Sequence, residues 1–322
     1  MTETTQTIVM TGATRGIGYE AARNLLRRRT DVHLVLLARE TTGAEMLPRL
    51  QEISPAVSLI CTDLASKASI ETAAAQLEDL FDAGELPALR GVVCNGGVHL
   101  ADALHTTVDG YETTFAVNVL STHLLLRRLH PHLQAPAHIV VTVSDAHFGD
   151  IRHTGGTLPA PRWSTPEILF QPGAFTRPER VRAGRRAYAT SKLAGVHLVH
   201  EWARRLPEGL DIVSYNPSLV TGTGLARDAG GAFPFLMKWI VPVLEATPIV
   251  DTAAVAGGKL ADVILGVTSA PTGSYIHRTR VTASSAESYD ADRERALWDW
   301  MEQASASRAA HPSSPHPVEP DL

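Results

Sequence analysis

The chain has 322 residues, of which 44% are apolar and 20% are charged, an ordinary composition for a soluble globular protein. Its formal net charge of −5 excludes a broad basic face, so we do not expect nucleic acid or anionic membranes as partners. The two cysteines, Cys61 and Cys94, are too few for a disulfide framework or a four-cysteine zinc site.

The sequence shows no targeting or membrane segment. Its first residues have no basic region and no long apolar region, so we expect no secretory signal. No uncharged apolar run approaches the roughly 20 residues that span a bilayer. We therefore expect a cytoplasmic protein without an integral membrane segment. Residues 1–303 are predicted to form one domain, and residues 304–322, rich in Ala, Ser, Pro and His, are predicted to be disordered.

Short apolar runs alternate with helix-length amphipathic patterns along most of the chain. The predicted strands, rich in Val, Ile and Leu, are Thr7–Met10, His33–Ala38, Val57–Thr62, Gly91–Cys94, His138–Val143 and Ile212–Asn216. The predicted helices are Ile17–Arg29, Gly43–Ile53, Lys67–Phe81, Val108–His132 and Arg186–Leu206. This alternation predicts an α/β fold with a single doubly wound parallel sheet and helices on both of its faces.

Two segments interrupt the alternation. Residues 148–186 form an insertion far longer than a usual connection between a strand and a helix, so we expect it to be functional or disordered. Residues 221–243 are predicted to form a substrate loop. Both segments follow carboxyl ends of predicted strands, where α/β sheets bind ligands. Their aromatic and apolar side chains either line a substrate pocket or pack the loops down: Trp163, Phe170, Phe175, Phe233, Phe235, Met237 and Trp239.

A glycine-rich turn, Thr11-Gly-Ala-Thr-Arg-Gly-Ile-Gly18, follows the first predicted strand and opens the first helix. Its glycines permit a tight turn and let the backbone approach a pyrophosphate, which the N-terminus of the helix attracts. A glycine turn alone is a weak signal, but this one has a strand before it and a helix after it. The turn predicts a dinucleotide site that includes Gly12, Thr14, Arg15, Gly16, Ile17 and Gly18.

The residues after the second and third strands favour NADP(H) as the cofactor. The second strand ends in Ala38-Arg39, without the acidic side chain that usually binds the ribose 2′-hydroxyl of NAD. Arg39 and Arg15 can instead pair with a 2′-phosphate, although both could also be solvated surface side chains. Asp63 and Leu64 are candidates for contacts with the adenine, and Asp63 could equally cap a helix.

A second pattern, Tyr188-Ala-Thr-Ser-Lys192, places two functional groups four residues apart, on one face of a helix. A nearby ammonium favours the phenolate, so we expect Lys192 to lower the pKa of Tyr188 towards a useful range. Ser144, at the end of the fifth strand, can hydrogen-bond the substrate oxygen. Asn118, a polar residue inside an apolar helix, could hold a water that links Lys192 to bulk solvent. The alternative is an ordinary amphipathic helix face.

Taken in order, the motifs TGATRGIG, CTDLAS, CNGG, FAVN, VTVSDAH and YATSK resemble the short-chain dehydrogenase/reductase family. The resemblance covers nearly all of Thr7–Val220 and implies a Rossmann fold with about seven strands. It implies that Tyr188 is the acid–base group, that Lys192 binds the nicotinamide ribose, that Ser144 polarises the carbonyl and that Asn118 completes a proton relay. It also implies cofactor contacts from Asn95, Gly96, Gly97, Tyr188, Lys192, Pro217, Val220 and Thr223.

Within the family, the chain resembles the branch of retinol dehydrogenases and light-dependent protochlorophyllide reductases. The similar stretches are Val93–Val98, Thr107–Glu112, the long insertion, Thr223–Arg227 and the patterns near Gly273, Ala283 and Arg295. The sequence departs from those reductases because Leu219 stands where they have an active-site Cys. Ser218 also replaces the usual Gly after the aligned Pro217. We therefore carry over the scaffold and a large apolar pocket, and not the light reaction.

The residues and the resemblance together predict NADPH-dependent reduction of a carbonyl on a bulky hydrophobic substrate, such as a polyketide or terpenoid of secondary metabolism. A protochlorophyllide-reductase-like enzyme that reduces a C=C bond and a non-catalytic NADP(H) sensor are the alternatives. His147 and His153 could touch the substrate, although loop histidines are more often surface residues. No metal-binding motif is present, so we expect no metal. The insertion resembles that of monomeric carbonyl reductases, which favours a monomer.

Overall fold

The computed structural model describes residues 4–221 and 250–306. Its main sheet confirms the predicted α/β fold, with the strand order β10-β9-β6-β5-β4-β1-β2-β3. Seven of the eight strands run parallel, and only β10, at one edge, is antiparallel to its neighbour. The strands are β1 (Gln6–Thr11), β2 (Val32–Ala38), β3 (Val57–Cys61), β4 (Leu89–Cys94), β5 (Leu133–Thr142), β6 (Leu210–Asn216), β9 (Tyr275–His277) and β10 (Arg280–Thr282).

The sheet reverses its direction of winding between β1 and β4. From β1 the chain proceeds outward to β2 and β3, whereas from β4 it proceeds the other way to β5 and β6. In a doubly wound sheet, ligands bind in the crevice outside the carboxyl ends of the strands at such a reversal. The segments that follow β1 and β4 therefore meet where a cofactor is expected.

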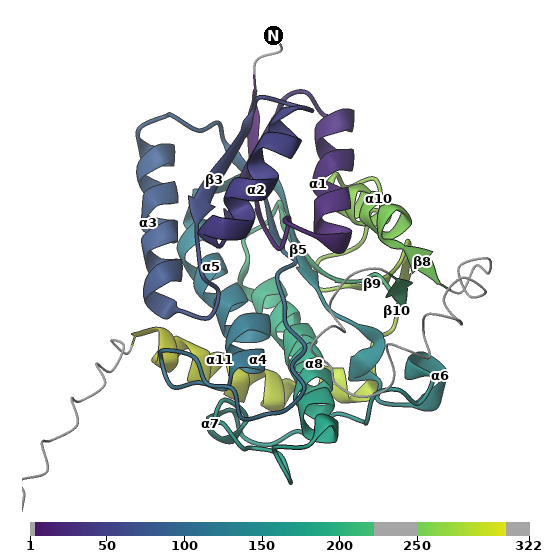
Figure 1. Cartoon of the computed structure of the whole chain (residues 1–322). Helices are drawn as coiled ribbons and strands as arrows, with labels where there is room; N and C mark the ends of the chain where they lie inside the picture. Colours follow the sequence, from purple (N-terminus) through teal and green to yellow (C-terminus); the bar gives the residue numbers. More distant parts are fainter. Residues whose placement is uncertain (1–3, 222–249, 307–322) are drawn as a thin grey trace, which may run out of the picture.

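Helices cover both faces of the sheet, as Figure 1 shows. One face packs against α1 (Gly16–Arg28), α2 (Glu40–Gln51) and α10 (Ala253–Ile264), and the other against α3 (Lys67–Asp82), α5 (Ser121–Leu129) and α8 (Val181–Arg205). Successive strand residues belong to opposite cores: Ile8 and Met10 lie in the α1 core, and Val9 lies in the α3 core. This follows from the two-residue period of a strand, and burial on both sides explains the continuous apolar runs.

The predicted helix Val108–His132 is too long at its start and is not a single α-helix. Gly110 has a φ of 83° and belongs to a turn closed by the bridge between Thr106 and Glu112. Because Glu112 caps the helix by accepting a hydrogen bond from the Phe115 amide, the helix begins at the next residue. It continues as α4 (Thr113–Phe115), the π-helix η1 (Ala116–Leu120), α5 and the 3₁₀ turn η2 (His130–His132).

The insertion 148–186 is described throughout and folds onto the body of the protein. It contains α6 (Ile151–Thr154) and α7 (Pro166–Leu169), and α8 begins inside it at Val181, before the predicted start. Phe170 and Phe175 are fully buried, and Phe170 stacks on Trp300 with ring centroids 4.1 Å apart. Trp163 packs edge-on against His197. These three aromatic rings pack the insertion down, so their expected role in lining a pocket is wrong.

The C-terminal part of the described chain packs against α8. Helix α11 (Ala291–Ala306) lies across α8 in Figure 1, and its Glu294 carboxylate binds His200 and Arg204 of α8. The predicted disordered tail begins three residues too early, because residues 304–306 belong to α11. Ala304 is buried, and its carbonyl accepts a hydrogen bond from the Lys67 ammonium. Residues 222–243 of the predicted substrate loop and 307–322 of the predicted tail lie outside the described residues.

The smaller elements complete the carboxyl side of the sheet. They are the 3₁₀ turns η3 (Asp145–His147) and η4 (Ala286–Tyr289), and the two parallel strands β7 (Val220–Thr221) and β8 (Asp251–Thr252). In 4–221 and 250–306 no helix is both long and apolar enough to cross a membrane.

Candidate active site

The glycine turn after β1 needs its glycines. Gly12 and Gly16 have φ values of 69° and 55°, a region that side chains with a Cβ rarely adopt. A Cβ on Gly18 would lie 2.1 Å from the Gly12 carbonyl oxygen, and one on Gly12 would lie 2.7 Å from the Gly96 amide nitrogen. Helix α1 begins at Gly16 and contains Ile17, so the turn presents the start of a helix to the crevice. This backbone fits a pyrophosphate.

The loop after β4 closes the same crevice. Asn95 joins it to its neighbours, since its Nδ2 donates to the Gly12 carbonyl (3.1 Å) and its Oδ1 accepts from the Thr142 hydroxyl (3.0 Å). A Cβ on Gly97 would lie 3.0 Å from Asn118 Oδ1 and 3.7 Å from Lys192 Nζ. Close packing of glycine backbone therefore continues from the start of α1 to the neighbourhood of Asn118 and Lys192.

The residues predicted to bind the adenosine end lie at the surface. Arg15 and Arg39 are both exposed, and neither forms an ion pair in the part of the chain that is described, not even with the neighbouring Glu40. Asp63 accepts a hydrogen bond from the Ala65 amide (3.0 Å), and Ser66, not Asp63, caps α3. Leu64 lies against Gly96 and Thr14 is half-buried. Both arginines are therefore exposed cations with no acidic partner among the described residues.

The predicted chemical residues converge at the carboxyl end of β5. Tyr188 and Lys192 on α8 are 5% and 7% exposed, and Lys192 Nζ lies 5.6 Å from the centroid of the Tyr188 ring. The ammonium donates a hydrogen bond to the Thr142 carbonyl (2.9 Å). Ser144, two residues further along, bonds the Tyr188 side chain. The spacing of four residues therefore places both side chains on one face of α8, near the carboxyl end of β5.

The expected lowering of the Tyr188 pKa is wrong in this structure. Burial raises the pKa of Tyr188 to about 12, and the hydrogen bond with Ser144 opposes this effect without cancelling it. Burial also lowers the pKa of Lys192 to about 8. Desolvation disfavours the charged form of both groups, and sequence spacing does not report it. At neutral pH Tyr188 consequently holds its proton and can act as a donor.

Asn118 lies in the π-helix η1 and joins two parts of the site. Its Oδ1 accepts from the Val98 amide (2.8 Å), and its Nδ2 donates to the Val98 carbonyl (3.0 Å) and the Ser191 hydroxyl (3.0 Å). A π-turn inside an α-helix often marks a functional site. The side chain ties the loop after β4 to α8, and the water relay expected of Asn118 stays a prediction.

Sequence reasoning missed His99. Its ring stacks on the Tyr188 ring, with centroids 4.3 Å apart and planes inclined by 18°. Burial, Arg185 and Lys192 lower the pKa of His99 to about 4, so the ring is neutral at physiological pH. Nothing in the local sequence predicts this contact, because the two residues come from different strand–helix units.

The role expected of the loop histidines is also corrected. His147 is 1% exposed, and its Nδ1 lies 2.6 Å from the Ser144 carbonyl while its Nε2 accepts from the Ser285 amide (3.1 Å). It is therefore neither a surface nor a substrate-binding residue, and it ties the Ser144 turn to the C-terminal part of the chain. His153 stacks on Phe148 at 3.7 Å instead.

Asp145 was likewise missed and anchors the turn on its other side. Its carboxylate accepts from Asn216 Nδ2 (2.6 Å) and from the Tyr275 hydroxyl (3.2 Å). Burial, together with the Asp145 charge, raises the pKa of Tyr275 well above its ordinary value. The turn that carries Ser144 is thereby fixed to β6 and β9.

The segment after β6 contains the remaining predicted cofactor residues. Pro217 is buried, and Ser218 has a φ of 64°, a conformation that favours the glycine expected there. Val220 pairs with Asp251 in the two-stranded sheet, and Leu219 is 52% exposed. The remaining residue, Thr223, lies outside the described residues.

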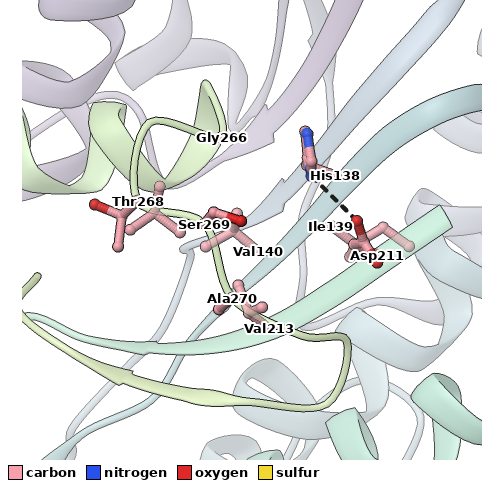
Figure 2. A pocket seen from close by; sticks show the side chains of 10 residues that line it. His138, Ile139, Val140, Asp211, Val213, Gly266, Thr268, Ser269 and Ala270 are labelled. Atoms are coloured by element: carbon pink, nitrogen blue, oxygen red, sulfur yellow. Dashed lines mark ion pairs between the residues drawn. The ribbon is translucent and has the colours of Figure 1, made fainter. Parts of the chain in front are cut away.

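A small pocket elsewhere is not part of this site. Figure 2 shows it between β5, β6 and the loop 266–270, with a volume of about 40 Å³. The ion pair of His138 and Asp211, 3.9 Å apart, borders it. That volume holds about one water molecule, so the pocket is too small for an organic substrate. Across 4–221 and 250–306, His, Cys, Asp and Glu side chains form no group that could hold a metal ion.

The glycine cradle and the Ser144–Tyr188–Lys192 group together define an oxidoreductase of the nicotinamide-nucleotide class. Sequence comparison then identifies the family. The model of the short chain dehydrogenase family matches residues 6–154. A putative daunorubicin C-13 ketoreductase from Streptomyces sp. (strain C5) is 30% identical over 300 residues, which cover 91% of this chain and 90% of that protein. The chain belongs to the short-chain dehydrogenase/reductase family.

Two further similarities are more limited. A WW domain-containing oxidoreductase from Danio rerio is 31% identical over 227 residues, which are 68% of this chain and only 50% of that protein. Among solved structures, the NADPH-bound carbonyl reductase from chicken fatty liver has a TM-score of 0.60 and 19% identity, covering 87% of this chain and all of that one. At this identity the structure supports the fold alone.

Proposed function

We propose that the protein reduces a carbonyl group of a bulky, apolar substrate, with a proton from Tyr188. When bound, NADPH supplies the hydride that the carbonyl carbon accepts. Ser144 polarises the carbonyl oxygen and Tyr188 protonates it, which yields an alcohol and NADP⁺. When the proton leaves, Tyr188 becomes a negatively charged phenolate, and the nearby Lys192 ammonium stabilises this negative charge.

The buried Tyr188, held beside Lys192 on α8, is the observation that carries this proposal. Burial raises the pKa of Tyr188, so the phenol holds a proton at neutral pH that it can donate to a carbonyl oxygen. It lies between Ser144 and Lys192, at the end of the glycine cradle. Arg15 and Arg39 support NADP(H) over NAD(H), because both are exposed and neither forms an ion pair within residues 4–221 and 250–306.

The apolar character of the substrate is supported by the surroundings of Tyr188 and by one relative. Leu158 of the insertion packs with Ala146, Tyr188 and Ala189. The Streptomyces relative, similar along most of both chains, bears the name of a ketoreductase that acts on a daunorubicin compound. The resemblance to retinol dehydrogenases and protochlorophyllide reductases supports the same class of large, apolar substrate.

The test is consumption of NADPH in the dark with a panel of polycyclic and other bulky ketones. We expect turnover in the wild type and a loss of kcat of about 10²- to 10⁴-fold in Tyr188→Phe. Tyr111→Phe is the control, since this ring packs against Phe170 and Trp300 instead. Tight NADPH binding without turnover of any ketone would contradict the proposal. Turnover only under light would favour the protochlorophyllide-reductase type.

We further propose a monomeric, cytoplasmic protein whose residues 1–303 act as one catalytic domain. Many family members associate through the helix that carries the tyrosine. Here α7 and α11 pack together, and α11 lies on α8, which supports a monomer. The free thiols of Cys61 and Cys94 suit a reducing compartment. Analytical ultracentrifugation that finds a stable dimer would contradict the monomer.

A further inference from the structure

One network of hydrogen bonds holds both His99 and Tyr188. Asn118 binds the amide and the carbonyl of Val98, so the backbone next to His99 is fixed on two sides. The same Asn118 amide donates to the Ser191 hydroxyl, and that hydroxyl donates to the Tyr188 carbonyl (2.8 Å). The loop after β4 and helix α8 are thus fixed relative to each other where the two rings meet.

The stacked rings are close and partly enclosed. With a centroid separation of 4.3 Å and an inclination of 18°, His99 covers one face of the Tyr188 phenol. The side chains of Ala146, Leu158 and Ala189 also contact Tyr188, which leaves it 5% exposed. His99 is the described aromatic ring that stacks on Tyr188, and it covers one face of the phenol.

Burial, assisted by the charges around the pair, keeps the imidazole neutral. His99 Nε2 is buried and has no hydrogen-bond partner in the described structure. Arg185 and Lys192 are the charged groups that act on His99, and both disfavour its protonated form. Lys192 is consequently the cation beside the phenol, and His99 contributes a flat, uncharged surface.

We propose that His99 is a positioning residue that holds the Tyr188 phenol by ring stacking and shields it from water. Its role is to fix the direction in which the Tyr188 hydroxyl points and to keep the phenol protonated until a substrate oxygen accepts the proton. The kinetic part of this inference rests on the proposed carbonyl reduction. The stacking itself and its effect on Tyr188 do not.

Two substitutions separate stacking from polarity. His99→Phe keeps a flat ring and removes the nitrogens, so we expect kcat within about threefold of the wild type. His99→Ala removes the ring, and we expect kcat to fall by about 10- to 100-fold, since small misplacements of reacting groups have effects of this size. KM for NADPH should be unchanged in both, because the contact of the His99 ring that the structure shows is with Tyr188, and His99 Nε2 has no hydrogen-bond partner among the described residues. Unchanged NADPH binding also shows that the variants are folded.

The pH dependence gives a readout that a purely structural role would not change. Opening the phenol to water in His99→Ala should move its pKa from about 12 towards the ordinary 10.0, so the alkaline fall in kcat should begin at lower pH. His99→Phe should keep the wild-type profile. The same shift in the Tyr188 pKa is measurable without substrate. The tyrosinate absorbance of each protein is titrated with and without the further substitution Tyr188→Phe, and the difference between the two curves is the titration of Tyr188.

The outcomes divide the two proposals. If the wild type turns over no ketone, the proposed function fails, and the tyrosinate titration still tests His99. If His99→Ala has the same kcat and the same Tyr188 titration curve as the wild type, the positioning role of His99 is overturned. An equal fall in kcat in His99→Phe and His99→Ala would also overturn the positioning role, because the ring nitrogens and not the flat ring would then be required.

Discussion

The proposed site has a nucleotide end and a chemical end, and the two are built by different means. At the nucleotide end, glycine backbone forms the cradle, and exposed arginines provide charge in water. At the chemical end, Tyr188 and Lys192 are buried side chains whose pKa values differ from their ordinary ones. The first end depends on backbone space and the second on desolvation. Substitutions should therefore affect binding at one end and proton chemistry at the other.

The largest effect should come from filling the backbone space at the nucleotide end. The Cβ in Gly18→Ala would lie 2.1 Å from the Gly12 carbonyl oxygen, which cannot move without distorting the turn. We expect NADPH affinity to fall by about 100-fold or more, and stability to fall by about 1–3 kcal/mol. Fluorescence titration and urea unfolding measure the two effects.

Gly258→Ala is the matched control, because a Cβ there meets nothing within 4 Å on helix α10. It should leave NADPH binding unchanged and stabilise the protein by up to about 1 kcal/mol. If Gly18→Ala binds NADPH with wild-type affinity, the nucleotide end does not depend on close glycine packing as stated above.

At the chemical end, Lys192→Met should lower activity and raise stability. We expect kcat to fall by about 100-fold or more, as for loss of a group that assists proton transfer. Replacing a buried cation by an apolar side chain of similar size should stabilise the protein by about 1 kcal/mol or more. Thermal and urea unfolding of the two proteins at pH 7 check this.

The difference in stability should depend on pH. The Lys192 pKa is about 8 in the folded protein and ordinarily 10.5, so between these values the unfolded chain binds more protons. The free energy of unfolding that Lys192 contributes thus rises with pH, and the advantage of Lys192→Met should narrow from pH 8 to pH 10. A constant difference across this range would show that Lys192 is not desolvated.

A smaller effect should follow from removing charge at the exposed end. Arg39→Ser should lower the preference for NADPH over NADH by about 10- to 100-fold, the value of one or two charge-assisted hydrogen bonds. The effect should weaken at high salt, because Arg39 is exposed. Arg49→Ser, on the same helix and paired with Glu45, is the control. Equal losses in both variants would rule out a 2′-phosphate contact at Arg39.

The smallest effect should come from Ser218, outside both mechanisms. With a φ of 64°, this residue occupies a left-handed conformation that costs a side chain about 1–2 kcal/mol. Ser218→Gly should stabilise the protein by up to about 1 kcal/mol, whereas Ser218→Ala should not. Urea unfolding of the two variants distinguishes relief of backbone strain from loss of the hydroxyl.

The nucleotide end was more predictable from sequence than the chemical end. The run Thr11–Gly18 is continuous, and its backbone needs are encoded in the glycines themselves. The spacing of Tyr188 and Lys192 likewise predicted a shared helix face. Their pKa values were not predictable, because burial comes from Leu158 and other residues distant in sequence.

His99, Asp145 and His147 were missed or misjudged for the same reason. Each acts through a partner in another strand–helix unit, and no local pattern marks such a contact. The aromatic residues Phe170 and Phe175 show the opposite error. Their composition fits a substrate pocket and a packed loop equally well, and only the position of α11 decides between the two.

The seating of α11 on α8 has a consequence for synthesis on the ribosome. Helix α8 receives its outer cover, through Glu294 with His200 and Arg204, from a segment that is translated after every strand of the main sheet. Domains form as their parts emerge, and the sheet strands up to β6 precede that cover. A nascent chain halted before α11 would therefore expose the bare flank of α8 to chaperones, and this part of the fold would be complete only after α11 has emerged.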